Sequence, residues 1–230
     1  MCGRYTQTAG VEALRRRFLF EPTRFELPPR YNVAPSQDAP VVIRREGKRQ
    51  LELFRWGLVP SWAKDPSLGS RQINARCETA AAKPSFRRSF AARRCLVLAD
   101  GFYEWKPVAP KLKWPMRVVL RSREPFAFAG LWDEWVPPGG RPLRTFTILT
   151  AGAPGSLKAI HDRVPVILPP DGEDLWLDEA AKAEQLQSLL AAPAEGALEA
   201  YPASPLVNSA KADTPDCIQE TPPGEQPPLF

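Results

Sequence analysis

The second residue, Cys2, places a thiol beside the start of the chain. Initiator methionine is generally removed when the next side chain is small, so we expect Met1 to be removed and Cys2 to carry the free α-amine. An α-amine has an unperturbed pKa of about 7.7–8.0, against about 10.4 for lysine, and is therefore nucleophilic near neutral pH. With an aldehyde it would form an imine, on which the thiol could close to give a five-membered thiazolidine. The thiol could instead attack an acyl carbon, or Cys2 could simply begin a first strand.

Two other side chains could move protons near neutral pH. His161 is the only histidine in the chain, so it is the sole imidazole available for acid–base work. Glu104 lies between Tyr103 and Trp105 in an expected aromatic strand. A carboxyl group that is desolvated in such a setting has a raised pKa and can serve as an acid or a base. If Glu104 instead faces solvent at a sheet edge, it has no such role.

The composition is that of a soluble globular protein with one domain. The chain has 230 residues, of which 43% are hydrophobic and 25% charged. Its net charge is +5, a mild bias towards polyanionic partners. Most of the arginines lie before position 125 and are interleaved with Trp and Phe. That mixture suits a groove for single-stranded nucleic acid, although scattered arginines also make an ordinary solvated surface.

The cysteine and histidine content argues against metal sites. None of the four cysteines is paired in a CxxC motif, and one histidine cannot make a multi-histidine site. The sequence therefore predicts no disulfide, no metal and no cofactor, in a monomer of the reducing cytoplasm. No apolar run approaches the roughly 18–20 residues that span a bilayer, and the polar residues after Met1 do not resemble an export signal.

The apolar pattern predicts an α+β fold, a single domain dominated by antiparallel β-strands with a barrel-like core and a few peripheral helices. Strands are expected at residues 39–43, 50–56, 94–99, 116–121, 126–132, 144–150 and, last in the chain, 204–208. Helices are expected at residues 10–20, 79–83 and 171–192. The domain is expected to span residues 1–213, followed by a Pro-rich and mobile tail at 214–230.

Six segments of the chain together resemble one family, the SOS-response-associated peptidases (SRAP), which are abasic-site-processing proteins. The segments are Cys2-Gly3-Arg4-Tyr5, Arg30-Tyr31-Asn32-Val33-Ala34-Pro35, Trp56-Gly57-Leu58-Val59-Pro60-Ser61-Trp62, Asn74-Ala75-Arg76, Ala99-Asp100-Gly101-Phe102-Tyr103-Glu104-Trp105 and Ile160-His161-Asp162-Arg163. They occur in the family's order from residue 2 to about 208, so the resemblance covers nearly the whole chain.

The resemblance implies an enzyme of the DNA damage response whose partner is single-stranded DNA containing abasic sites. Cys2 would react with the ring-opened deoxyribose aldehyde and form a thiazolidine DNA–protein crosslink, in a cytoplasmic protein that associates with the nucleoid. The resemblance also implies that Asn74 orients the sugar or the Cys2 backbone. Glu104 would shuttle protons for imine formation and crosslink reversal, and His161 would assist opening of the sugar ring.

The same resemblance implies a set of DNA contacts. Arg4 and Arg76 would hold the phosphates on either side of the lesion. Asn32, Pro35 and Trp62 would contact or wedge the adjacent bases, and Thr150 would hydrogen-bond within the pocket. Such phosphate contacts fix position without reading sequence.

Two other functions remain open on the sequence. One is a cysteine peptidase or autopeptidase with Cys2 as nucleophile and His161 as base, which would need an oxyanion hole and a peptide groove. The other is a non-catalytic module that binds single-stranded DNA through its arginines and aromatic side chains. Cys77, next to the Asn-Ala-Arg motif, is interpreted as a structural residue.

Overall fold

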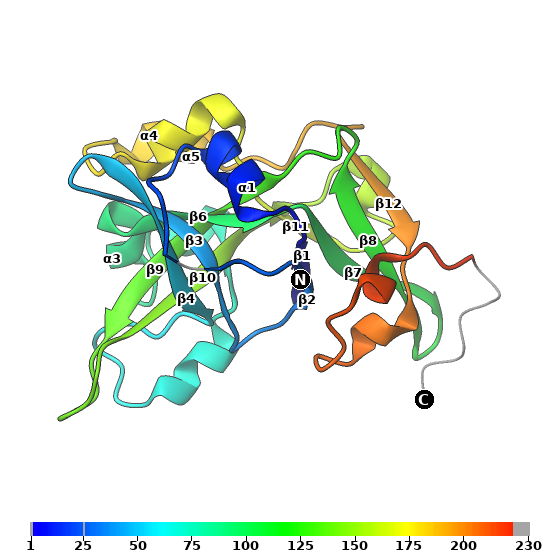
Figure 1. Cartoon of the computed structure of the whole chain (residues 1–230), viewed down its shortest axis with the longest axis horizontal. Coiled ribbons are helices and arrows are strands. Elements are labelled where there is room, and N and C mark those ends of the chain that lie inside the picture. The colour runs from blue at the N-terminus through cyan, green and yellow to red at the C-terminus, as the bar shows by residue number, and fades with distance from the viewer. Residues whose placement is uncertain (1, 25, 223–230) are drawn as a thin grey trace.

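The computed structural model describes residues 2–24 and 26–222, which fold into two β-sheets with short helices around them (Figure 1). The first sheet has five strands in the order β12-β8-β7-β1-β2. Its strands are β1 (Arg4–Gln7), β2 (Arg30–Val33), β7 (Gly101–Ala109), β8 (Leu112–Leu120) and β12 (Leu198–Pro202). The N-terminal strand β1 pairs antiparallel with both β2, the edge strand, and β7, so Cys2 and Gly3 lead directly into a paired strand of this sheet.

The second sheet closes on itself. Its strands are β3 (Asp38–Arg45), β4 (Lys48–Trp56), β5 (Asn74–Arg76), β6 (Arg94–Ala99), β9 (Phe126–Trp135), β10 (Leu143–Gly152) and β11 (Arg163–Pro165). β10 pairs with both β4 and β9, and β4, β3, β6 and β9 pair in turn. These pairings form a ring, which confirms the predicted α+β fold with its barrel-like core. Only the pairings of β10 with β4 and β5 are parallel among the described strands.

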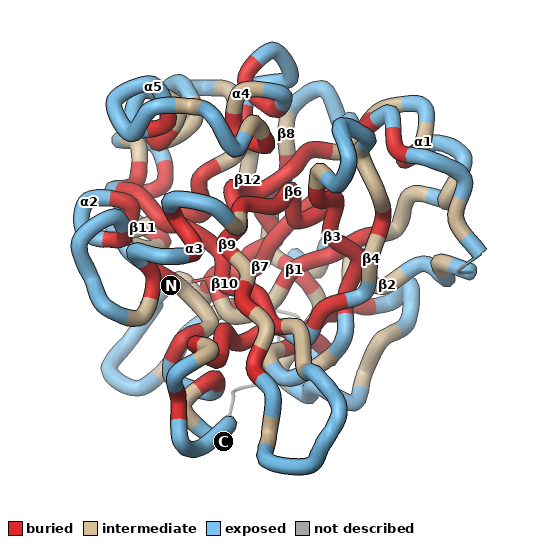
Figure 2. The backbone as a smooth tube through the Cα atoms, turned by 90° about the vertical axis from the view of Figure 1, so that its left-hand side faces the viewer, coloured by how far each residue is buried: buried red, intermediate tan, exposed pale blue. Residues whose placement is uncertain are grey.

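The helices are short and peripheral. They are α1 (Val11–Phe18), α2 (Cys77–Ala80), α3 (Arg87–Ala92), α4 (Glu173–Leu177) and α5 (Ala183–Ser188). Apolar side chains of all five join β6 and β9 in one core cluster. Figure 2 shows the buried strands at the centre and exposed helices and loops outside. None of the helices in residues 2–24 and 26–222 is long and apolar enough to span a membrane.

The N-terminal segment is inserted between the two sheets. Cys2 and Tyr5 belong to a second core cluster that also contains Trp56 and Phe128 of the barrel. The ring of Tyr5 lies 5.2 Å from that of Trp56 and 5.8 Å from that of Phe128, both in edge contacts. Edge-to-face aromatic pairs of this kind add about 0.5–1.5 kcal/mol beyond their buried area. This packing fixes the start of the chain inside the fold.

The prediction of one helix over residues 171–192 was wrong. Two short helices, α4 and α5, occupy this segment, and the chain is extended at Asp178. The buried guanidinium of Arg94 donates to the carbonyls of Trp176 and Asp178, which takes up acceptors that a continuous helix would use. Of the leucines expected to face inward, Leu177, Leu186 and Leu190 are buried in the core, whereas Leu175 is only half-buried and Trp176 is buried beside it.

The end of the domain also differs from the prediction. Residues 205–208 form a 3-10 turn, because Ser204 accepts a hydrogen bond from the Leu206 N–H and Pro205 opens the turn; the last strand is β12 instead. Pro215–Ile218 form a further turn in which Cys217 is buried, and Thr221 N donates to the Pro202 carbonyl. The packed chain therefore extends beyond residue 213, and the rest of the predicted tail, residues 223–230, lies outside the described residues.

Candidate active site

Cys2 is buried between the sheets, directly before strand β1. Its Sγ donates a hydrogen bond to the Arg4 carbonyl oxygen at 3.4 Å. Burial, and then the nearby carboxyl of Glu104, raise the pKa of the Cys2 thiol far above its usual range. Because the thiolate is the nucleophilic form of cysteine, this thiol is not poised to attack by itself.

Asn74 connects Cys2 to the barrel. It begins β5, which runs parallel to β10 with Asn74 beside Ile148. Its Nδ2 donates to the Cys2 carbonyl oxygen at 2.7 Å. Its Oδ1 is buried and accepts no hydrogen bond within the described part of the chain. Buried acceptors are normally satisfied, so this oxygen is suited to a ligand hydroxyl or amine.

Glu104 and His161 line the same small pocket. The pocket walls are otherwise apolar and consist of Phe102, Val118, Leu157, Ile160 and Val164. Glu104 is only 3% exposed, and burial raises its pKa to about 7. A carboxyl group with that pKa can either donate or accept a proton at neutral pH. Burial also lowers the pKa of His161, which favours the neutral imidazole.

The hydrogen bonds of His161 define its tautomer. The backbone N–H of Arg163 donates to Nδ1 at 3.0 Å, so the neutral ring carries its proton on Nε2. Nδ1 also lies 2.8 Å from Oδ1 of Asp162, whose side chain is 85% exposed. That contact becomes a hydrogen bond only when Nδ1 carries a proton, and Nδ1 then no longer accepts from the Arg163 N–H.

Arg4 and Asn32 form one unit. Nη1 of Arg4 donates to Asn32 Oδ1 at 3.2 Å and to the Val207 carbonyl at 2.6 Å. Asn32 is fully buried, and its Nδ2 donates to the carbonyls of Ser209 and Ala212 at 2.9 and 2.7 Å. The side chain of Asn32 is thus in contact with Arg4 and with the backbone of residues 207–212.

Thr150 and Arg76 are neighbours on adjacent strands. Thr150 of β10 is in register with Arg76 of β5. Thr150 is buried; its Oγ1 donates to the Ala75 carbonyl and accepts from Nε of Arg163. Arg163 in turn makes two hydrogen bonds to the carboxylate of Glu78, at 3.1 and 2.8 Å. Arg76 is exposed, whereas Thr150 serves to hold Arg163.

Trp62 projects from a loop whose backbone is fixed. The N–H of Ser61 donates to Asp133 Oδ2 at 2.8 Å, and the Ala63 carbonyl accepts from Trp135 Nε1 at 2.7 Å. Trp62 is 59% exposed between these anchors and borders a hollow that also contains Lys64 and Arg71. Pro35, just after β2, is half-buried. A rigid, exposed indole beside cations is a suitable platform for stacking a base.

Sequence reasoning missed two charged residues. Lys113 of β8 is exposed, and its charge partly offsets the effect of burial on the pKa of Glu104 and adds to it at His161. Arg163 ends the segment Ile160-His161-Asp162-Arg163, but no feature of the sequence assigned it a role. Neither residue could have been placed from spacing alone, because Lys113 and His161 come together only through the folding of β8 and the loop before β11.

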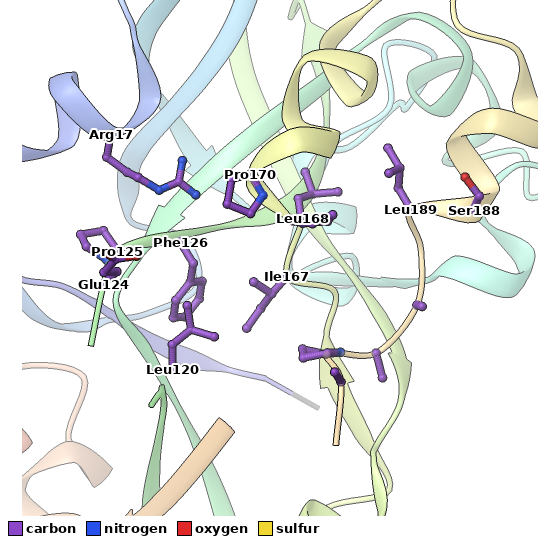
Figure 3. A pocket seen from close by; sticks show the side chains of 15 residues that line it. Arg17, Leu120, Glu124, Pro125, Phe126, Ile167, Leu168, Pro170, Ser188 and Leu189 are labelled. Carbon is purple, nitrogen blue, oxygen red and sulfur yellow. The ribbon is translucent and has the colours of Figure 1, made fainter. Parts of the chain in front are cut away.

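The described residues contain no group of three or more His, Cys, Asp or Glu side chains that could hold a metal ion. An apolar pocket of about 340 Å³ lies elsewhere, between the start of β9 and the segment after α5 (Figure 3). Phe126, Ile167 and Leu189 contribute to its lining, and Arg17 at its rim is paired with Glu173. None of the predicted site residues lines this pocket.

The fold and the site together define an α+β protein in which a cysteine at the start of the chain is enclosed between a barrel and a sheet, beside a carboxyl–imidazole pair. The chain belongs to the family described as SOS response associated peptidase (SRAP), whose sequence model matches residues 1–210.

Proteins similar to this chain come from bacteria and vertebrates. It is 44% identical over 222 residues to the abasic site processing protein YoqW of Bacillus subtilis, covering 95% of this chain and 99% of that protein. It is 35% identical over 262 residues to the abasic site processing protein HMCES of Gallus gallus, covering 95% and 77%.

Solved structures share the fold. A protein from Bacteroides thetaiotaomicron superposes with a TM-score of 0.87 at 24% identity, covering 96% of this chain and 100% of that chain. A phage-related protein from Bordetella bronchiseptica gives a TM-score of 0.69 at 30% identity, covering 87% and 93%.

Proposed function

We propose that this protein processes abasic sites in single-stranded DNA by trapping the ring-opened sugar aldehyde at Cys2 after Met1 is removed. The observation that carries the proposal is the buried position of Cys2, with Asn74 on its carbonyl and the Glu104 carboxyl, whose pKa is about 7, beside its thiol. The names of the relatives, abasic site processing proteins, support the choice of substrate. Such a protein acts in the cytoplasm, on the nucleoid.

The chemistry proceeds without a cofactor. The Cys2 amine adds to the aldehyde carbon, and loss of one water gives the imine. Glu104 in its acid form protonates the departing hydroxyl, which leaves as water and gives a protonated imine. The sulfur then adds to the imine carbon and the thiol proton passes to the Glu104 carboxylate, which closes the thiazolidine with no change in oxidation state. The raised pKa of the thiol is consistent with this order, in which the amine reacts first.

The sugar must open before it can react. An abasic deoxyribose is mostly a cyclic hemiacetal, and its opening needs one proton donor and one acceptor. His161 in its protonated form can donate a proton to the ring oxygen while the Glu104 carboxylate accepts one from the hydroxyl, since both line one pocket. The same pair can run the steps in reverse, so crosslink reversal would use the same residues.

Arg4 and Arg76 are proposed to hold the phosphates beside the lesion, and Trp62 and Pro35 to contact adjacent bases. Asn32 and Thr150 would act indirectly, through Arg4 and Arg163. Binding dominated by phosphate contacts is tolerant of sequence and weakens with salt. A missing base also lowers the cost of turning the sugar into a pocket, which favours lesions over intact nucleotides.

A peptidase function is less compatible with this site. A cysteine peptidase needs a thiolate held next to an imidazole. Here the Cys2 Sγ donates to the Arg4 carbonyl, and its pKa is raised rather than lowered. We therefore assign the cysteine to aldehyde capture.

The proposal is tested with mature protein, in which Met1 removal is verified by mass, and a single-stranded oligonucleotide with one abasic site. We expect a band of lower mobility on a denaturing gel that survives heat. It should be absent with intact DNA and with Cys2→Ala. Cys2→Ser keeps the amine but forms a much weaker ring, so its product should not survive heating. Absence of the band with a free Cys2 amine would refute covalent capture.

A further inference from the structure

The β7–β8 hairpin extends the face of the sheet that carries Glu104. Glu104 lies opposite Met116, and two residues further along Lys106 lies opposite Trp114. Side chains two residues apart on a strand share a face, and so do directly opposed residues of neighbouring antiparallel strands. Glu104, Lys106 and Trp114 therefore point to the same side of the sheet.

Exposure increases along this face from the pocket to the hairpin tip. Glu104 and Met116 are buried, whereas Lys106 and Trp114 are half-buried and residues 107–111 are exposed. In Figure 1 the hairpin of β7 and β8 extends away from the barrel. The face of the sheet that carries Glu104 thus continues outward to the side chains of Lys106 and Trp114.

The opposite face of the hairpin is already occupied. Tyr103 donates its hydroxyl hydrogen to the Tyr31 carbonyl at 2.8 Å, and Trp105 donates from Nε1 to Asn208 Oδ1 at 2.7 Å. Both rings pack with Ala203 and Val207 near the C-terminal end. These two aromatic side chains are structural, so the half-buried Trp114 is the indole of this hairpin that faces the site.

The hairpin is also positively charged. Residues 105–115 contain Lys106, Lys111 and Lys113 and no Asp or Glu. Lys113 lies close enough to Glu104 and His161 to influence both groups. Lys106 beside an indole, on a hairpin with two further lysines and no carboxylate, supplies the positive charge and the stacking surface that a single-stranded DNA contact needs.

We propose that the β7–β8 hairpin is a binding arm for the DNA strand on one side of the lesion. The indole of Trp114 stacks on the flanking base, and Lys106 contacts the phosphate that joins this nucleotide to the abasic sugar. The inference rests on the proposed function for its ligand. It adds a second stacking platform to Trp62, on a different sheet of the molecule.

Affinity for oligonucleotides of defined length tests the arm. Mature protein is titrated with abasic oligonucleotides that carry nucleotides only 5′ of the lesion, only 3′ of it, or on both sides. A stacked base contributes roughly fivefold to 150-fold in affinity. Trp114→Ala should lose a factor in that range with the oligonucleotides that extend on one particular side, and with those extended on both. It should bind the remaining oligonucleotide like the wild type.

Three further variants control this measurement. Trp114→Phe keeps a flat ring and should retain most of the affinity. Lys106→Gln should weaken binding to the same oligonucleotides and reduce the dependence of log affinity on log salt by about one. Lys48→Gln removes an equal charge at the turn between β3 and β4 and should have no side-specific effect.

The outcomes separate the two proposals. If Trp114→Ala and Lys106→Gln bind every oligonucleotide as the wild type does, or lose affinity equally for all of them, the β7–β8 hairpin does not bind the strand beside the lesion. A wild-type protein that binds single-stranded DNA but forms no crosslink would refute aldehyde capture, while the affinities would still decide the role of the hairpin.

Discussion

The side chain of Asn74 holds the carbonyl of Cys2 through a hydrogen bond of 2.7 Å from its Nδ2. Asn74 belongs to β5, which is anchored on β10 of the barrel, whereas Cys2 precedes β1 of the other sheet. This bond therefore links the two sheets at the proposed reacting residue. The position of the Cys2 amine and thiol relative to the barrel depends on it.

Asn74→Ala should slow crosslinking without weakening DNA binding. A reacting group that is misplaced by about 1 Å can lose on the order of 100-fold in rate, so we expect a loss of roughly tenfold to 100-fold in the single-turnover rate. Affinity for intact single-stranded DNA should stay within about twofold of wild type. The change is measured by quenched-time gels, beside an Asn208→Ala control that removes the acceptor of Trp105 on the other side of the sheet. A wild-type rate in Asn74→Ala would contradict the role of this bond.

The raised pKa of the Glu104 carboxyl predicts a specific dependence of the free energy of unfolding on pH. Burial raises its pKa from 4.5 to about 7, so between these values the folded protein binds more protons than the unfolded chain. Its stabilising contribution is fully present below pH 4.5 and is lost as pH rises through about 7. The shift corresponds to about 3 kcal/mol in the free energy of unfolding.

Glu104→Gln removes this titration and provides the measurement. Urea unfolding of wild type and variant should show that the variant gains stability relative to wild type as pH rises from 5 to 8, by about 2–3 kcal/mol. A difference between the two proteins that is constant over this range would mean that Glu104 is ionised throughout, and would remove its role as a proton donor.

The sequence predicted the strand-rich fold because its short apolar runs, bounded by turn residues, form the buried strands β3, β6, β9 and β10. Local pattern failed where a distant side chain decides the backbone. The break between α4 and α5 depends on Arg94, which lies far earlier in the chain and donates hydrogen bonds to the carbonyls of Trp176 and Asp178. The turn at 215–218 is held in the same way by long-range contacts of Tyr103 with Cys217.

The site residues show the same division. The motif residues Cys2, Asn74, Glu104 and His161 are associated in the structure, and their chemistry could be anticipated from residue type. Whether a polar residue faces DNA or the protein could not be anticipated. Asn32 and Thr150 are buried, because their partners Ser209 and Arg163 come from segments that are remote in sequence.

Arg94→Met should be among the most destabilising changes in the chain. The guanidinium is buried and donates to four backbone carbonyls, those of Phe90, Ala91, Trp176 and Asp178. Removing it leaves these acceptors unsatisfied, at a cost of about 3–5 kcal/mol in the free energy of unfolding. Arg87→Met on the exposed start of α3 serves as the control and should change stability by less than about 0.5 kcal/mol. Equal chemical denaturation midpoints for the two variants would show that the hydrogen bonds of Arg94 to these four carbonyls do not stabilise the fold.

Asn32 should affect DNA binding only through Arg4. It accepts a hydrogen bond from Arg4 Nη1 and donates to the backbone of residues 207–212. Asn32→Ala therefore removes a hydrogen bond that holds the Arg4 guanidinium in position. We expect Asn32→Ala and Arg4→Gln each to weaken binding of single-stranded DNA, by roughly fivefold to thirtyfold for Arg4→Gln, the range of one charged hydrogen bond of about 1–2 kcal/mol.

A double-mutant cycle distinguishes positioning from direct contact. If Asn32 acts by orienting Arg4, the double variant binds no more weakly than Arg4→Gln, because the positioned group is already missing. If Asn32 touches DNA itself, the two losses add. The slope of log affinity against log salt gives an independent readout, since both single variants should lose the same phosphate contact and therefore the same part of the slope. Asp213→Asn, which alters the carboxylate that accepts from the N–H groups of Tyr31 and Asn32, should move the slope in the same direction. Additive losses of affinity, together with unequal slopes against log salt, would mean that Asn32 contacts DNA directly and does not act through Arg4.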